Sequence, residues 1–69
     1  MRILKLRKGV NLITVSRPQT VYELLYKVWP YVEKVQAFEP GRGWITLSAE
    51  DLLYPGRGYW VRMSRGGEA

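Results

Sequence analysis

Short stretches of alternating apolar and polar residues dominate the chain, and most are bounded by glycine or proline. Val10–Val15 is rich in β-branched residues, while Val32–Phe38, Trp44–Leu47 and Tyr59–Met63 alternate in the manner of strands. Residues 2–8 alternate imperfectly between basic and aliphatic side chains, which indicates a partly exposed strand. The pattern therefore predicts about five strands.

One segment has helical periodicity instead. Thr20 and Glu23 fit a capping box, in which the threonine hydroxyl binds the glutamate amide and the glutamate side chain reaches back. We expect a helix from Val21 to about Trp29, ended at Pro30 because the residue before a proline is pushed out of helical geometry. The helix should face the sheet with its apolar stripe, which consists of Val21, Leu24, Leu25 and Val28.

Two further segments have weaker signals. Ser48-Ala49-Glu50-Asp51 combines a potential N-cap with acidic residues, so we expect one short helical turn over residues 49–53. Residues 65–69 contain two glycines and are expected to form a flexible C-terminal tail.

A short repeat occurs at an offset of 15 residues. Pro40-Gly41-Arg42-Gly43 and Pro55-Gly56-Arg57-Gly58 each precede a predicted strand that begins with aromatic residues. Proline fixes the first central position of a type II turn, and glycine supplies the positive φ of the second. Both segments are therefore predicted to be turns that lead into a strand. Their arginines are either solvated or part of a backbone nest for an anion.

These elements predict a β-rich α+β fold. We expect a single domain over residues 1–64, with about five mainly antiparallel strands in a small sheet or barrel. One α-helix should lie between the second and third strands.

Composition argues against catalysis. The 69 residues include no cysteine and no histidine, which excludes thiol nucleophiles and the commonest metal ligand and general base. The six carboxylates have no spacing typical of acid–base work. We expect no catalytic residue, metal, cofactor or small-molecule substrate. No apolar run approaches the ~20 residues of a membrane span, and no signal peptide is recognised, so a cytoplasmic or virion-associated protein is expected.

The chain is rich in aromatic residues for its size. Three Trp, five Tyr and one Phe must be accommodated by a domain that buries only about 60% of its unfolded surface. Some rings are therefore expected to contact another molecule. We predict a protein–protein interface, arising from self-association or a larger assembly. Its aromatic anchors would be Tyr22, Tyr26, Trp29, Trp44 and Trp60, with Arg42, Arg57 and Arg62 as the polar rim.

The net charge of +5 leaves a second hypothesis open. Arg57 and Arg62 near Trp60 would suit a stacking platform for single-stranded nucleic acid. The basic residues Arg2, Lys5, Arg7 and Lys8 either protect a strand edge from aggregation or contact phosphates.

Four segments together resemble a known type of module. They are Gly9–Val15, Thr20–Leu25, Phe38–Trp44 and Leu53–Val61. The last of these segments has the pattern Leu-x-Pro-Gly-x-Gly-Tyr-Trp-Val. The pattern resembles the small β-rich modules appended to bacterial and archaeal surface-layer, adhesin and other envelope proteins. This resemblance implies a structural or adhesive role without catalytic residues, as in an envelope component, a capsid decoration or a tail protein.

Overall fold

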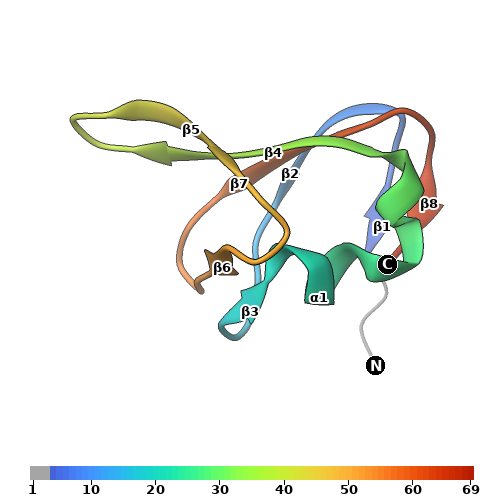
Figure 1. Ribbon diagram of the computed structural model, residues 1–69, viewed down its shortest axis with the longest axis horizontal. Helices are drawn as coiled ribbons and strands as arrows, with labels where there is room; N and C mark the ends of the chain where they lie inside the picture. Colours follow the sequence, from blue (N-terminus) through green and yellow to red (C-terminus); the bar gives the residue numbers. More distant parts are fainter. Residues whose placement is uncertain (1–3) are drawn as a thin grey trace.

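The computed structural model describes residues 4–69, in which antiparallel strands form three sheets (Figure 1). The central sheet has the strand order β2-β7-β4-β5, formed by β2 (Gly9–Ile13), β7 (Tyr59–Met63), β4 (Val32–Glu39) and β5 (Gly43–Leu47). Two small sheets pair β1 (Lys5–Leu6) with β8 (Gly67–Glu68) and β3 (Gln19–Thr20) with β6 (Leu52–Leu53). The β-rich class and the four strands of the central sheet are as predicted. The strand expected over residues 2–8 is limited to Lys5–Leu6 within the described residues, and positions 2 and 3 lie outside them.

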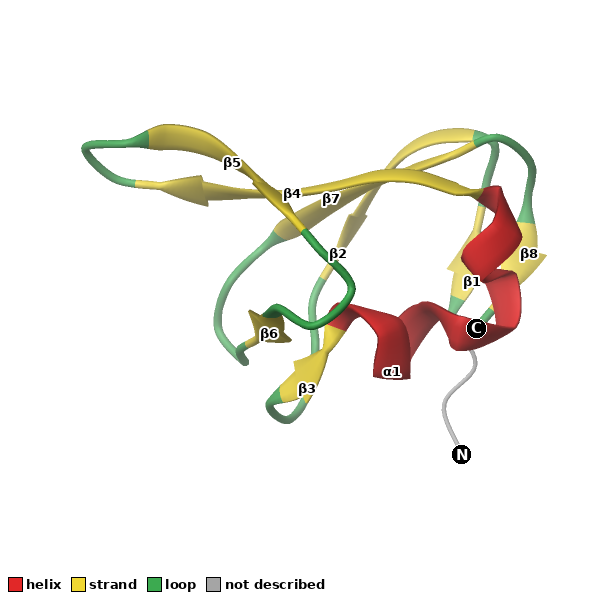
Figure 2. Cartoon of the chain, in the orientation of Figure 1, coloured by secondary structure: helices red, strands yellow, loops and turns green. Residues whose placement is uncertain are grey.

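The strand count and the place of the helix differ from the prediction. The described residues form eight strands rather than about five, because β3, β6 and β8 are two-residue strands without a readable alternation. The helix follows β3 rather than coming directly after β2. It begins as α1 (Val21–Leu25) and continues as the 3₁₀-helix η1 (Tyr26–Tyr31), beneath the central sheet (Figure 2).

The start of α1 is as expected, whereas its end is not. The Glu23 amide donates to the Thr20 hydroxyl at 3.0 Å, and the Thr20 amide donates to the Glu23 carboxylate at 3.1 Å. The predicted end at Pro30 is wrong, because η1 includes Pro30 and ends at Tyr31. Proline has a φ compatible with helical geometry, and a short 3₁₀ segment tolerates one missing donor.

The core lies between the helix and the central sheet. Val21 and Leu25 are fully buried, Val28 nearly so, and Leu24 packs against them, which confirms the predicted stripe. From the sheet, Val35, Val61 and Met63 point toward the helix and are almost completely shielded from solvent. The large side chains of one sheet face therefore supply the interior.

The predicted helical turn over residues 49–53 is wrong. Asp51 accepts hydrogen bonds from the Ser48 amide at 2.7 Å and the Ser48 hydroxyl at 3.1 Å, which gives a turn and not a helix. The backbone carbonyls of Ala49 and Asp51 instead accept from the amides of Tyr22 and Val21. This segment thus satisfies donors at the start of α1, while Leu52 and Leu53 enter β6.

The C-terminal residues, expected as a flexible tail, form part of a sheet. Gly67 and Glu68 pair with Leu6 and Lys5, and the Ala69 amide and carbonyl both bond to Leu4. A side chain at Gly67 would meet Val28, which explains how a glycine permits this close approach.

The two Pro-Gly-Arg-Gly segments have the predicted positive φ at their first glycine, +84° at Gly41 and +83° at Gly56. Their surroundings differ, however. The first closes the β4–β5 hairpin, with the Arg42 amide donating to the Glu39 carbonyl, whereas the second connects β6 to β7 in another sheet.

Candidate interaction surface

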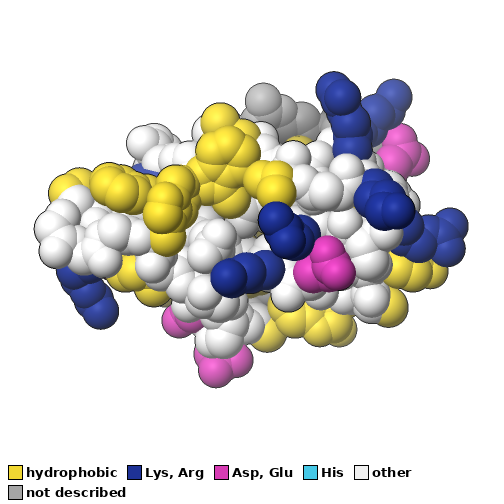
Figure 3. Space-filling view, turned by 90° about the horizontal axis from the view of Figure 1, so that it is seen from above, with side chains coloured by type: hydrophobic (Ala, Val, Ile, Leu, Met, Phe, Trp, Pro, Cys, Tyr) yellow, Lys and Arg dark blue, Asp and Glu magenta, His cyan; other side chains and the backbone are white. Residues whose placement is uncertain are grey.

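The face of the central sheet that points away from the helix is called the outer face here. The strand register places alternate residues of all four strands on it, with Trp60 beside Leu12 and Gln36, and Phe38 beside Trp44. Figure 3 views this side of the molecule and shows a hydrophobic band crossing it next to several basic side chains. The outer face consists of Val10, Leu12, Lys34, Gln36, Phe38, Trp44, Thr46, Trp60 and Arg62.

Large apolar side chains on the outer face are exposed to solvent. The exposed fraction is 62% for Leu12, 54% for Phe38, 52% for Trp44 and 51% for Val10, while Trp60 is half-buried. No other segment of residues 4–69 covers this face in Figures 1 and 2. Contiguous exposed apolar surface of this kind marks interaction sites in soluble proteins.

Three aromatic rings form a row along the outer face. The ring centroids of Phe38 and Trp44 lie 5.3 Å apart, and those of Trp44 and Trp60 lie 6.0 Å apart. Both contacts are edge-to-face, a favourable geometry that fixes each ring against its neighbour. Trp44, Trp60, Val10 and Gln36 border a shallow hollow of about 340 Å³. Each ring of the row is therefore in contact with its neighbour.

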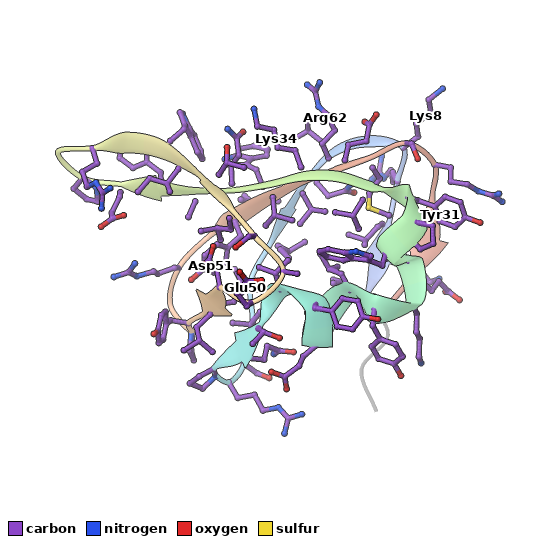
Figure 4. All side chains as sticks on the ribbon, in the orientation of Figure 1. Lys8, Tyr31, Lys34, Glu50, Asp51 and Arg62 are labelled. Atoms are coloured by element: carbon purple, nitrogen blue, oxygen red, sulfur yellow. The ribbon has the colours of Figure 1, made fainter. Side chains whose placement is uncertain are left out.

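Basic side chains border the aromatic row. Lys34 and Arg62 lie directly opposite each other on β4 and β7, and Figure 4 shows both projecting from the outer face. Among the described residues, the ion pair within 4.0 Å joins Arg42 and Glu39 at the hairpin tip, so neither Lys34 nor Arg62 has a carboxylate at that distance. Two like charges directly opposite each other slightly destabilise the folded protein. An anionic group bound between them would relieve this repulsion.

The predicted anchors fall on two separate sides of the molecule. Trp44, Trp60 and Arg62 lie on the outer face, and Arg42 lies at the tip of the adjoining hairpin. The remaining residues of the prediction, Tyr22, Tyr26, Trp29 and Arg57, lie on α1, η1 and the β6–β7 connection.

The helix aromatics are divided between the interior and the surface. Trp29 is half-buried, packs against the core and contacts the edge of Tyr22 at a centroid distance of 5.2 Å. Tyr22 and Tyr26 are about half exposed, and so is Leu52 of β6, which pairs with Thr20 just before α1. Of the large hydrophobic residues that are exposed in the described part of the chain, four lie together on the outer face, namely Val10, Leu12, Phe38 and Trp44.

Sequence analysis missed Val10, Leu12, Lys34 and Phe38 as members of this surface. The alternation of β2 and β4 would have grouped them, but it leaves open which side of the sheet the helix covers. Val10 and Leu12 also resemble core residues, since large aliphatics in short strands are usually buried. Which side of the sheet the helix covers depends on the path of the chain after β3.

No grouping of acidic residues in the described part of the chain has the geometry of a metal site. Within residues 4–69, no helix is long and apolar enough to cross a membrane. Comparisons with family models, curated proteins and solved structures found no match to the chain.

Proposed function

We propose that this protein is a non-catalytic interaction module that takes part in protein assembly through the outer face of its central sheet. The observation that supports this most is the combination of Leu12, Phe38 and Trp44 on one face, each at least half exposed. Protein interfaces are centred on aromatic and aliphatic groups that exclude water, with arginine at the rim. Arg62 and Lys34 occupy that rim.

The ring geometry favours a protein over nucleic acid as the partner. Bases stack on open ring faces, but the edge-to-face contacts of Trp44 with Phe38 and Trp60 occupy part of those faces. Val10 and Leu12 add aliphatic surface, which bases do not use for stacking. A protein surface can cover both kinds of side chain.

The experiment is sedimentation of the purified protein from about 1 µM to about 1 mM, a range that detects weak association. We expect concentration-dependent association that Leu12→Ser and Phe38→Ser weaken without lowering the unfolding midpoint by more than a few degrees. Tyr54→Ser is the matched control, because Tyr54 is similarly exposed but lies outside the outer face. A monomer at every concentration, or association insensitive to both outer-face variants, would contradict the proposal.

The opposed Lys34 and Arg62 support a second candidate, binding of single-stranded nucleic acid. A gel shift with single-stranded oligonucleotides at about 50 mM salt tests it, because phosphate contacts are strongest at low salt. A shift that disappears in Lys34→Gln/Arg62→Gln, in a protein that remains monomeric, would favour this candidate over protein assembly.

A further inference from the structure

The free edge of β5 carries no feature that blocks pairing with another strand. β5 is the last strand in the order β2-β7-β4-β5, so one of its sides is unpaired in the described chain. Its residues, Gly-Trp-Ile-Thr-Leu, include no charge and no proline, and its register with β4 is continuous. Natural edge strands are usually protected by charges, prolines or bulges.

The other edge of the central sheet is built differently. The Asn11 side chain of β2 accepts from the Arg7 amide and donates to the Arg7 carbonyl, both at 2.9 Å, which ties the preceding loop to this strand. Arg7 and Lys8 place two positive charges directly before β2. The β5 edge is therefore the one suited to strand addition.

The β4–β5 hairpin also extends beyond the rest of the domain. Figure 1 shows its tip projecting from one end of the central sheet, away from the helix. Ile45 is half-buried on the face opposite Trp44, and it is not part of the hydrophobic core cluster. Only the tip of the hairpin is two-stranded, because Ala37 of β4 pairs with Tyr59 of β7 on one side and with Ile45 of β5 on the other. A two-stranded ribbon is only marginally stable, so a further strand beside β5 would stabilise this tip.

Charges at the two ends of β5 have opposite signs. Arg42 immediately precedes the strand, is well exposed and forms an ion pair with Glu39 of β4 at 3.8 Å. Glu50 and Asp51 lie in the turn that follows the strand (Figure 4). The bonds from Ser48 hold the Asp51 carboxylate next to the end of β5. An antiparallel copy of β5 would bring the positive end of each strand to the negative end of the other.

From this arrangement we propose that two copies of the protein join edge to edge through antiparallel β5 strands, with Ile45 on the two-fold axis. In this register Trp44 pairs with Thr46 of the second copy, and Arg42 lies opposite its Ser48, next to the Asp51 carboxylate. A parallel arrangement would instead place Arg42 beside Arg42. The charges thus select an antiparallel copy of the same chain.

Such pairing deepens the proposed function, on which it rests, because it joins two outer faces into one. Antiparallel neighbours have side chains on the same side, so both aromatic rows would lie on a single, wider sheet. Edge-paired dimers would then associate further through these joined outer faces, each of which carries Phe38, Trp44 and Trp60 twice.

The test uses opposite charges at the symmetry axis. In Ile45→Lys or Ile45→Glu, each substituted side chain meets its own copy, so we expect each variant alone to dimerise at least about tenfold more weakly than the wild type. An equimolar mixture in which one variant carries nitrogen-15 should recover mixed dimers, whose mass lies between those of the two homodimers and is distinguished by native mass spectrometry. Thermal unfolding of each variant verifies that the monomer is folded.

The two similar turns provide a matched control. Arg42→Glu and Arg57→Glu change the net charge equally, but only Arg42 lies at an end of β5. We expect Arg42→Glu to weaken dimerisation several-fold and Arg57→Glu to leave it unchanged.

Three results would overturn edge pairing: a wild-type monomer up to about 1 mM, dimers insensitive to charges at Ile45, or no recovery in the mixture. Dimers that persist in both Ile45 variants but are lost in Phe38→Ser would reject edge pairing and retain the outer-face proposal. Dimers that are lost in both Ile45 variants but persist in Phe38→Ser would retain edge pairing and reject association through the outer face.

Discussion

The two faces of the central sheet carry similar side chains in opposite surroundings. Val35, Val61 and Met63 on the inner face are buried, whereas Leu12, Phe38 and Trp44 on the outer face are at least half exposed. Both sets come from strands of the same sheet, and β4 carries members of both, so strand propensity does not separate them. The difference arises because α1 and η1 return to only one side. Hydrophobicity therefore identifies strands here, while the path of the helix determines which apolar residues become core.

The largest expected difference between the two faces concerns leucine truncation. Leu25→Ala removes a fully buried side chain beneath the inner face and should lower the free energy of unfolding by about 2–5 kcal/mol. Leu12→Ala on the outer face should change it by less than about 0.5 kcal/mol. Urea unfolding of both variants measures the contrast, and equal losses would show that the outer face is also covered.

A second pair of substitutions replaces a glycine by alanine, once next to the buried core and once next to the outer face. A Cβ at Gly67 would lie 2.8 Å from Cγ1 of buried Val28, so Gly67→Ala should destabilise the protein by about 1–3 kcal/mol. A Cβ at Gly58 would lie 3.3 Å from Cδ1 of exposed Leu12, which can move away. Gly58→Ala should be nearly neutral in thermal unfolding, and a loss as large as that of Gly67→Ala would contradict the assignment of Leu12 to an open surface.

A smaller effect is expected at the N-terminus of α1, which positions the helix under the inner face. Thr20→Ala removes the cap hydroxyl and should cost about 1 kcal/mol of stability in chemical unfolding. Ser at position 20 retains the hydroxyl and serves as the control, with little expected loss. Equal destabilisation by Thr20→Ala and Thr20→Ser would show that the cap hydrogen bond is not the cause.

The same cap makes a small part of the stability depend on pH. The hydrogen bond from the Thr20 amide lowers the pKa of Glu23 below 4.5, and the Thr20 hydroxyl and the positive charge of Arg17 act in the same direction. A lowered folded-state pKa gives stability that is present above pH 4.5 and is lost as pH falls through the lowered pKa. Wild type and Glu23→Gln should therefore differ near neutral pH and converge in acid. A difference that grows in acid would contradict this assignment.

Local sequence signals predicted the elements that depend on local interactions. The capping box at Thr20 and Glu23, the two positive-φ glycines and the alternation of β7 all follow from neighbouring residues. The sequence could not predict β3, β6 and β8, because two-residue strands are specified by distant partners. Ser48–Asp51 shows the limit most clearly, since its helix-start signal is used in a turn whose carbonyls accept from the first amides of α1.

The candidate surface was predictable only in part, for a related reason. Trp44, Trp60 and Arg62 were predicted as interface residues, but so were Tyr22, Tyr26 and Trp29 on the opposite side of the sheet. Composition shows an excess of aromatic rings, but it does not show on which side of the molecule these rings lie. Grouping Phe38, Leu12 and Val10 with the two tryptophans requires the β2-β7-β4-β5 strand order.

The three tryptophans allow the most direct test of the outer face as a binding surface. Each has one indole N–H signal in a proton–nitrogen NMR spectrum, and Trp44 and Trp60 lie on the outer face, whereas Trp29 packs against the core. As the protein concentration rises, we expect the Trp44 and Trp60 signals to shift or broaden and the Trp29 signal to stay in place. Movement of the Trp29 signal alone, or no movement of any of the three, would contradict the account.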